Sequence, residues 1–113
     1  MTDSILTSIK EMLGPSAEYT HFDNQIISHI NTALARLTLL GVGPSAGFRI
    51  KDSSAVWSDF ISDETKNFEG VKDYVYQKVK LVFDPPLNSA VLSTMKENLQ
   101  ELEFCLNVTA ENN

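Results

Sequence analysis

Apolar residues recur at steps of three and four along most of the chain, which is the spacing that places side chains on one face of an α-helix. The first such stretch predicts a helix over about 4–13, which Asp3 or Ser4 can cap and which Gly14-Pro15 ends. The second predicts a helix over about 22–40, stopped by the glycines and the proline that follow it. Each helix has a single apolar face, so each must pack against a neighbour.

Local signals mark where the helices begin. Thr20 with Asp23 resembles a capping box at the start of the second helix. The apolar pattern resumes over about 66–83 and again over about 89–106, where Asn88 or Ser89 can act as the N-cap. The pattern therefore predicts four helices.

An irregular stretch, 42–65, separates the second and third predicted helices. It contains turn-forming residues but also several aromatic ones. Phe48-Arg49-Ile50 alternates as a short strand does, and 58–61 suits one helical turn. Residues 109–113 are polar and predict a flexible tail. We therefore expect one domain, 1–113, that is mostly all-α: a four-helix bundle-like fold with an aromatic loop or short β insertion.

Composition narrows the classes of function. Nine Lys+Arg against fifteen Asp+Glu give a net charge of -6, which argues against ordinary binding to the phosphate backbone of nucleic acids. Cys105 is the only cysteine, so no intrachain disulfide can form, which fits a reducing compartment. The sequence has no apolar run of the roughly 20 residues that cross a membrane. We expect a protein that is made or assembled in the cytosol.

The sequence contains no recognisable catalytic constellation. Gly41-Val42-Gly43 follows a helix, which is the wrong context for a dinucleotide-binding turn. His21, His29 and Cys105 are widely separated, so no metal-ligand spacing is present. We expect His29, near the edge of the second helix's apolar stripe, and His21, at that helix's start, to be packing or capping residues, and Cys105 to be a small, partly buried apolar residue. The expectation is a protein with no catalytic residues, no cofactor and no metal.

Trp57 has two possible roles, one in the core and one at an interface. It either holds the irregular stretch onto the helices as part of a small core, or it anchors an interface, since tryptophan is enriched at binding hot spots. The second interpretation makes the aromatic insertion a contact between subunits or with a partner. The residues assigned to that interface are Phe48, Ile50, Trp57, Phe60 and Ile61.

The last predicted helix is acidic. Glu97, Glu101 and Glu103 follow Lys96, and no basic residue comes after them. The usual explanation is a solvated helix face. The alternative is an acidic face that lines a channel or docks onto a partner.

Four ordered stretches match the pattern of a known family. They are Met12-Leu13-Gly14-Pro15 with Tyr19-Thr20-His21-Phe22-Asp23 and Ile26-Ile27; Leu39-Leu40-Gly41-Val42-Gly43-Pro44 with Phe48, Ile50 and Trp57-Ser58-Asp59-Phe60; Val71-Lys72-Asp73-Tyr74-Val75-Tyr76-Gln77-Lys78-Val79-Lys80-Leu81 with Phe83-Asp84-Pro85-Pro86; and Met95-Lys96-Glu97 with Glu101-Leu102-Glu103 and Leu106-Asn107. With these stretches the chain resembles the phage head–tail connector family (head-completion or adaptor proteins) of siphophages that infect Gram-positive hosts. Three positions depart from the family pattern: Val56 replaces a polar residue before the tryptophan, and Phe104-Cys105 replaces Trp-Arg.

The resemblance implies a structural adaptor in the virion, at the head–tail interface, made in the host cytoplasm during assembly. Such a subunit forms a homo-oligomeric ring, commonly a dodecamer, beneath the portal protein. The ring extends the DNA channel, lets dsDNA pass without specific binding, and meets the next connector, stopper or tail protein. No cofactor and no membrane are implied.

Another class of function stays open from the residues alone. A small helical regulatory or protein-interaction module, antitoxin-like or DNA-associated, is also compatible with this size and composition. It would need a basic or peptide-binding face. Oligomeric state separates the two classes, because a ring favours the connector and a DNA-binding dimer favours the regulator.

Overall fold

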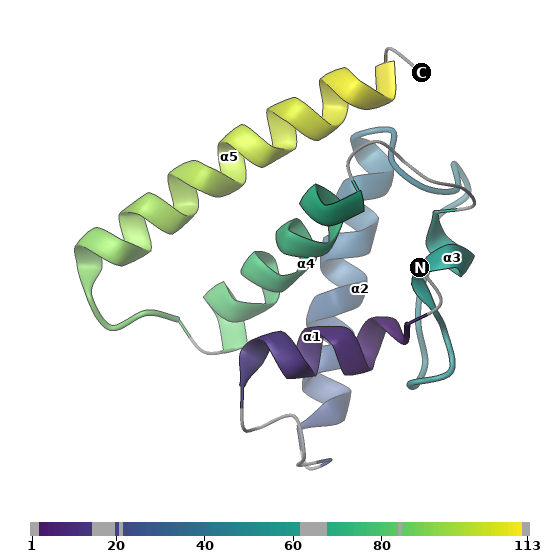
Figure 1. Ribbon diagram of the computed structural model, residues 1–113, viewed down its shortest axis with the longest axis horizontal. Helices are drawn as coiled ribbons and strands as arrows, with labels where there is room; N and C mark the ends of the chain where they lie inside the picture. Colours follow the sequence, from purple (N-terminus) through teal and green to yellow (C-terminus); the bar gives the residue numbers. More distant parts are fainter. Residues whose placement is uncertain (1–2, 15–19, 21, 62–67, 84, 112–113) are drawn as a thin grey trace.

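The computed structural model describes residues 3–14, 20, 22–61, 68–83 and 85–111. Its elements are five helices: α1 (Ile5–Leu13), α2 (Asp23–Leu39), α3 (Trp57–Phe60), α4 (Phe68–Phe83) and α5 (Ser89–Glu111) (Figure 1). Within these ranges no sheet forms, and the one β-type pairing is an isolated antiparallel bridge between Ser4 and Val56. The predicted all-α fold with four main helices is confirmed.

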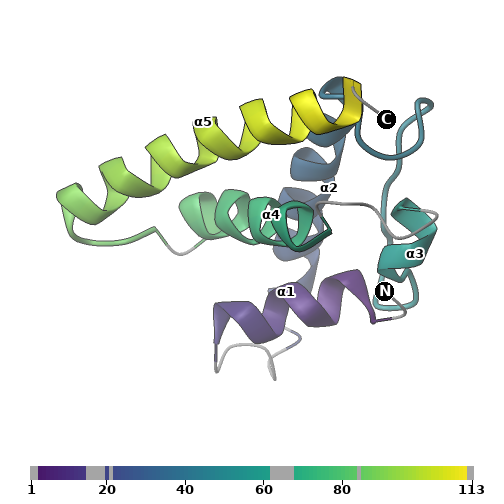
Figure 2. The ribbon, with the colours of Figure 1, turned by 45° about the horizontal axis from the view of Figure 1, so that its top comes forward.

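Helix α4 lies at the centre of the domain. It packs against α2, α5 and α1, and α1 also contacts α2 (Figures 1 and 2). Val71, Val75 and Val79, at steps of four, are completely buried on the core side of α4. They share one hydrophobic cluster with the buried stripe of α2, which includes Ile30 and Leu34. Each such side chain stabilises the fold by about 1.5–3 kcal/mol when it leaves water.

Two of the three N-terminal helix caps predicted from the sequence are present in the structure. Ser4 Oγ accepts from Thr7 N at 3.2 Å and caps α1. Asn88 Oδ1 accepts from Ala90 N at 2.8 Å at the start of α5. These side chains satisfy amides that the first turn of a helix leaves unpaired.

The capping box predicted at the start of α2 is wrong. Helix α2 begins at Asp23, its N-cap is Phe22, and no side chain bonds the first turn there. Thr20 contributes its carbonyl, which accepts from Asp23 N at 3.1 Å. The Asp23 carboxylate instead pairs with Lys10 of α1 at 2.7 Å, in a half-buried setting. The Asp23 side chain, which the predicted capping box would have used, therefore forms a tertiary ion pair instead.

Helix α5 continues to Glu111, beyond the predicted end near residue 106. The tail prediction is therefore wrong for 109–111, and 112–113 lie outside the described residues. Asn107 explains the extension, because its Nδ2 donates to the carbonyl of Leu40 at 3.1 Å, just after α2. One turn later, Ala110 packs so closely on Gly41 that a Cβ added there would lie 3.3 Å from the Ala110 Cβ.

The irregular stretch contains the helical turn that the sequence predicted, now α3, but not the short strand. Ile50 pairs with a side chain rather than with a strand: its N–H donates to Asn31 Oδ1 at 2.7 Å, and its carbonyl accepts from Asn31 Nδ2 at 3.0 Å. One amide side chain on α2 thus satisfies both backbone groups of Ile50. The end of the predicted insertion, 62–65, lies outside the described residues.

None of the helices in the described part of the chain is long and apolar enough to cross a lipid bilayer.

Candidate interaction surfaces

Trp57 lies inside the subunit, with 0 % of its surface exposed. Its indole N–H donates to Ser8 Oγ at 3.2 Å, and its ring meets Phe68 edge-to-face with centroids 5.8 Å apart. Its backbone N–H donates to the carbonyl of Asp3 at 3.1 Å. The residue therefore ties α1, α3 and α4 together, which supports the packing interpretation of Trp57.

The other apolar residues of the insertion are also mostly inside. Ile50, Phe60 and Ile61 are buried, and Phe48 is half-buried against the Phe60 ring, with centroids 5.5 Å apart. Phe60 leaves no room beside Gly43, where an added Cβ would overlap its ring. Four of the five predicted interface residues thus belong to the subunit's own core. A contact made by the insertion would have to use its exposed residues, such as Arg49.

The three predicted acidic residues do not share one face. Glu103 is turned toward the core, where Oε2 accepts from the Tyr74 hydroxyl at 2.6 Å and Oε1 accepts from Arg36 at 3.2 Å. Glu97 and Glu101 are exposed on the opposite side of α5. Only these two remain candidates for an acidic channel or docking face.

The contacts of Glu103 explain its electrostatics. Burial alone would raise the pKa of Glu103, but the hydrogen bonds from Tyr74 and Arg36 and the Arg36 charge outweigh it and lower the pKa. Burial, followed by the bond to Glu103, raises the pKa of Tyr74, which keeps the phenol protonated. We call these three side chains the Tyr74–Glu103–Arg36 junction. It joins α4, α5 and α2 at one point.

Two exposed apolar residues share the side of α5 that carries Glu97 and Glu101. Phe104 is 70 % exposed and Val108 is 36 % exposed. Steps of four, three and four place Glu97, Glu101, Phe104 and Val108 on one stripe, with Cys105 beside it and also exposed. We call these five residues the outer face of α5. The stripe is visible in the sequence as a second periodic set on the last helix, although the acidic-face prediction uses only its glutamates.

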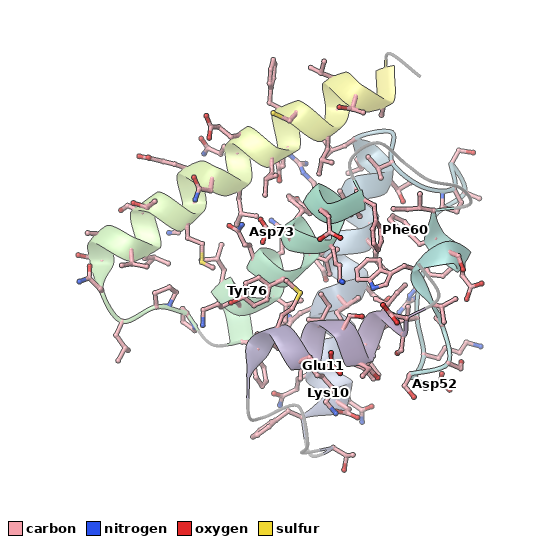
Figure 3. All side chains as sticks on the ribbon, viewed as in Figure 1. Lys10, Glu11, Asp52, Phe60, Asp73 and Tyr76 are labelled. Carbon is pink, nitrogen blue, oxygen red and sulfur yellow. The ribbon has the colours of Figure 1, made fainter. Side chains whose placement is uncertain are left out.

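A groove opens under the amino-terminal half of α5. That half projects past the other helices in both ribbon views (Figures 1 and 2). The groove has a volume of about 430 Å³ and is lined by Tyr76, Gln77, Ala90, Val91, Thr94, Met95 and Asn98. Asp73 and Tyr76 lie on α4 in the region between α5 and α1 (Figure 3). Asp73 accepts from Gln77 Nε2 at 2.8 Å and so fixes one wall.

Two adjoining hollows run along the exposed side of α2. They have volumes of about 550 and 400 Å³ and share Ala35 and Arg49. We call them together the α2 trough. Its floor consists of small side chains of α2, and its rim is the loop that Asn31 fixes at Ile50. The residues that line it are Asn24, Ile27, Ser28, Asn31, Thr32, Ala35, Thr38, Ala46, Gly47, Phe48, Arg49 and Ile50.

The described residues contain no group of three or more His, Cys, Asp or Glu side chains that could hold a metal ion. His29 is half-buried on α2, as expected of a packing residue, and His21 lies outside the described residues. Cys105 is exposed, so the expectation that it is partly buried is wrong. Its side of α5 faces away from the core.

A family model described as phage connector protein matches residues 5–113. The chain belongs to the phage connector protein family. No curated protein and no solved structure matches it. The family resemblance in the ordered motifs is therefore confirmed over nearly the whole length.

Membership of this family gives the connector its role at the head–tail junction of a phage, among other head and tail proteins. The conspicuous surfaces in the described part of this connector are the outer face of α5, the groove under α5 and the α2 trough. The buried aromatic residues and the junction hold these surfaces in fixed relative positions.

Proposed function

We propose that this connector is a non-catalytic structural subunit that assembles with copies of itself into a ring beneath the portal protein. The ring extends the DNA channel and presents its far side to the next connector, stopper or tail protein. The proposal places the protein in the virion, after assembly in the host cytoplasm. It requires no cofactor and no membrane.

The observation that carries the proposal is the separation of candidate contact surfaces on a rigid helical body. The outer face of α5 and the α2 trough belong to different helices, and the junction fixes α5 on α2. A subunit of a closed ring needs two such faces, because each copy contacts one neighbour with one face and the other neighbour with the other.

The charge supports the channel part of the proposal. The net charge of -6 opposes attraction to DNA, which would hold the genome in a channel that must let it pass. We expect no shift of linear double-stranded DNA in a gel at physiological salt.

The experiment is to mix the purified connector with the portal protein of its phage and image the complex by negative-stain electron microscopy. The expected result is an added ring of density, coaxial with the portal. The connector incubated with a capsid protein lacking portal is the control and should give no such ring. A connector that stays a dimer, ignores the portal and binds DNA would contradict the proposal and favour a regulator.

A further inference from the structure

The outer face of α5 has the character of a surface that is covered in an assembly. Phe104 is 70 % exposed, and Val108 lies one turn further along the same stripe. Apolar side chains of this size are favourably buried, by roughly 25 cal/mol for each Å² removed from water. Glu97 and Glu101 extend the stripe and make no ion pair among the described residues. The face therefore combines an aromatic projection with unpaired negative charge.

The α2 trough has the opposite character. Its floor of Ser28, Thr32 and Ala35 recurs at steps of four and three, so small side chains leave a recess along the helix. Arg49 lines both hollows, is exposed, and makes no ion pair with any described residue. The trough therefore combines a recess with unpaired positive charge.

We propose that the outer face of α5 of one copy docks into the α2 trough of the next copy. Phe104 would fill the recess over Ala35 and Thr32, and Arg49 would pair with Glu101. Small side chains on α2 allow a second helix to approach closely, within the usual 8–10 Å between packed helix axes. The occupant is a second copy because the complementary shapes and charges are carried by the same chain.

This contact is heterologous, so it propagates from copy to copy. It closes into a ring only if the angle between the two faces is fixed. The junction supplies that rigidity, together with the 3.1 Å bond from Asn107 to Leu40, because both tie the carboxy-terminal half of α5 to α2. The inference rests on the proposed function, since a ring of identical copies is what gives both faces an occupant.

The exposed Cys105 allows a direct test, because it lies on the outer face of α5. The variant Ala35→Cys adds a second thiol in the trough. Treatment with a short thiol–thiol linker should then produce a ladder of covalent multimers, since each copy can be linked to two neighbours. The variant Glu11→Cys is the matched control, because Glu11 is exposed on α1, a helix that contributes no residue to either face (Figure 3).

The expected result is a ladder with Ala35→Cys, and no species beyond a dimer with Glu11→Cys or with the unchanged chain. Equal ladders from the two variants, or none from either, would overturn the inference. A dominant dimer of the unchanged chain through Cys105 would also overturn it, because it would show that two outer faces meet each other.

Charge-reversal variants provide a second test of the docking. Arg49→Glu and Glu101→Arg should each slow the cross-linking of the Ala35→Cys variant about tenfold, and the two together should restore it. If neither single variant changes the cross-linking rate, the proposed pairing of Arg49 with Glu101 is wrong. The portal-binding images separate this inference from the proposed function. A ring that forms on the portal from the Ala35→Cys variant, with no cross-link between Cys105 and residue 35, would refute the docking but keep the connector role.

Discussion

The Tyr74 hydroxyl donates a 2.6 Å hydrogen bond to Glu103, and this bond ties the central helix α4 to α5. Arg36 of α2 holds the other carboxylate oxygen of Glu103 at 3.2 Å. Asn107 adds a hydrogen bond from α5 to the end of α2, and the buried apolar side chains of α5 in the described part are Leu99 and Leu106. The position of α5, and with it the position of the outer face, depends on this junction.

Tyr74→Phe should lower the free energy of unfolding by about 1–3 kcal/mol, because it leaves a partly buried carboxylate with one partner fewer. Urea unfolding followed by circular dichroism measures the change. Tyr76→Phe is the control: the Tyr76 ring lines the open groove, and the substitution should cost well under 1 kcal/mol. Equal losses in both variants would show that the bond to Glu103 contributes nothing particular.

Acid should weaken the junction through Glu103. The pKa of Glu103 is lowered in the folded chain, so its stabilising contribution is fully present above the unfolded value of about 4.3 and is lost as pH falls through the folded pKa. Glu103→Gln should therefore flatten the fall in unfolding free energy below about pH 5. Glu97→Gln, at an exposed site on the same helix, should keep the slope of the unchanged chain. Identical slopes in all three proteins would contradict this account of the Glu103 pKa.

Trp57→Ala should destabilise the fold by about 3–5 kcal/mol, as expected for removal of a completely buried aromatic side chain. Trp57→Phe should lose less, since it keeps most of the apolar volume and gives up the bond to Ser8. Thermal unfolding measures both. A Trp57→Ala protein that keeps its full stability but no longer assembles would restore the interpretation of Trp57 as an interface anchor.

Alanine substitutions at Gly43 and Gly47 distinguish the cost of a packing clash from the cost of backbone strain. Gly43 and Gly47 have φ of +82° and +95°, so alanine is strained by about 1–2 kcal/mol at either position. At Gly43 the added methyl group would also overlap the Phe60 ring, whereas at Gly47 it meets open space. Gly43→Ala should therefore lose more unfolding free energy than Gly47→Ala, by about 1–3 kcal/mol. A smaller loss at Gly43 would mean that Phe60 moves aside at little cost.

The sequence correctly predicted the features that depend on nearby residues, namely the main helices and two of their caps. Helical spacing located all four main helices, and Ser4 and Asn88 cap as their side chains allow. It failed where a distant residue intervenes. Lys10 takes the Asp23 carboxylate from the start of α2, and the bond from Asn107 to Leu40 anchors α5 past its predicted end.

The candidate surfaces were harder to predict for the same reason. Periodicity shows that Trp57 lies in an irregular aromatic stretch, but its direction depends on Ser8 and Phe68, which come from other helices. Glu103 has the same charge as Glu101 two residues earlier, yet Tyr74 and Arg36 turn it inward. The rim of the α2 trough has no signature in the sequence, because it is set by the pairing of Asn31 with Ile50.

The central claim is that this connector joins the phage head to the tail, and its gene can be deleted from the phage to test it. Electron microscopy of the resulting lysate should show capsids and free tails but no joined particles, and supplying the intact protein from a plasmid should restore complete virions. Normal numbers of tailed, infectious particles without the protein would contradict the claim.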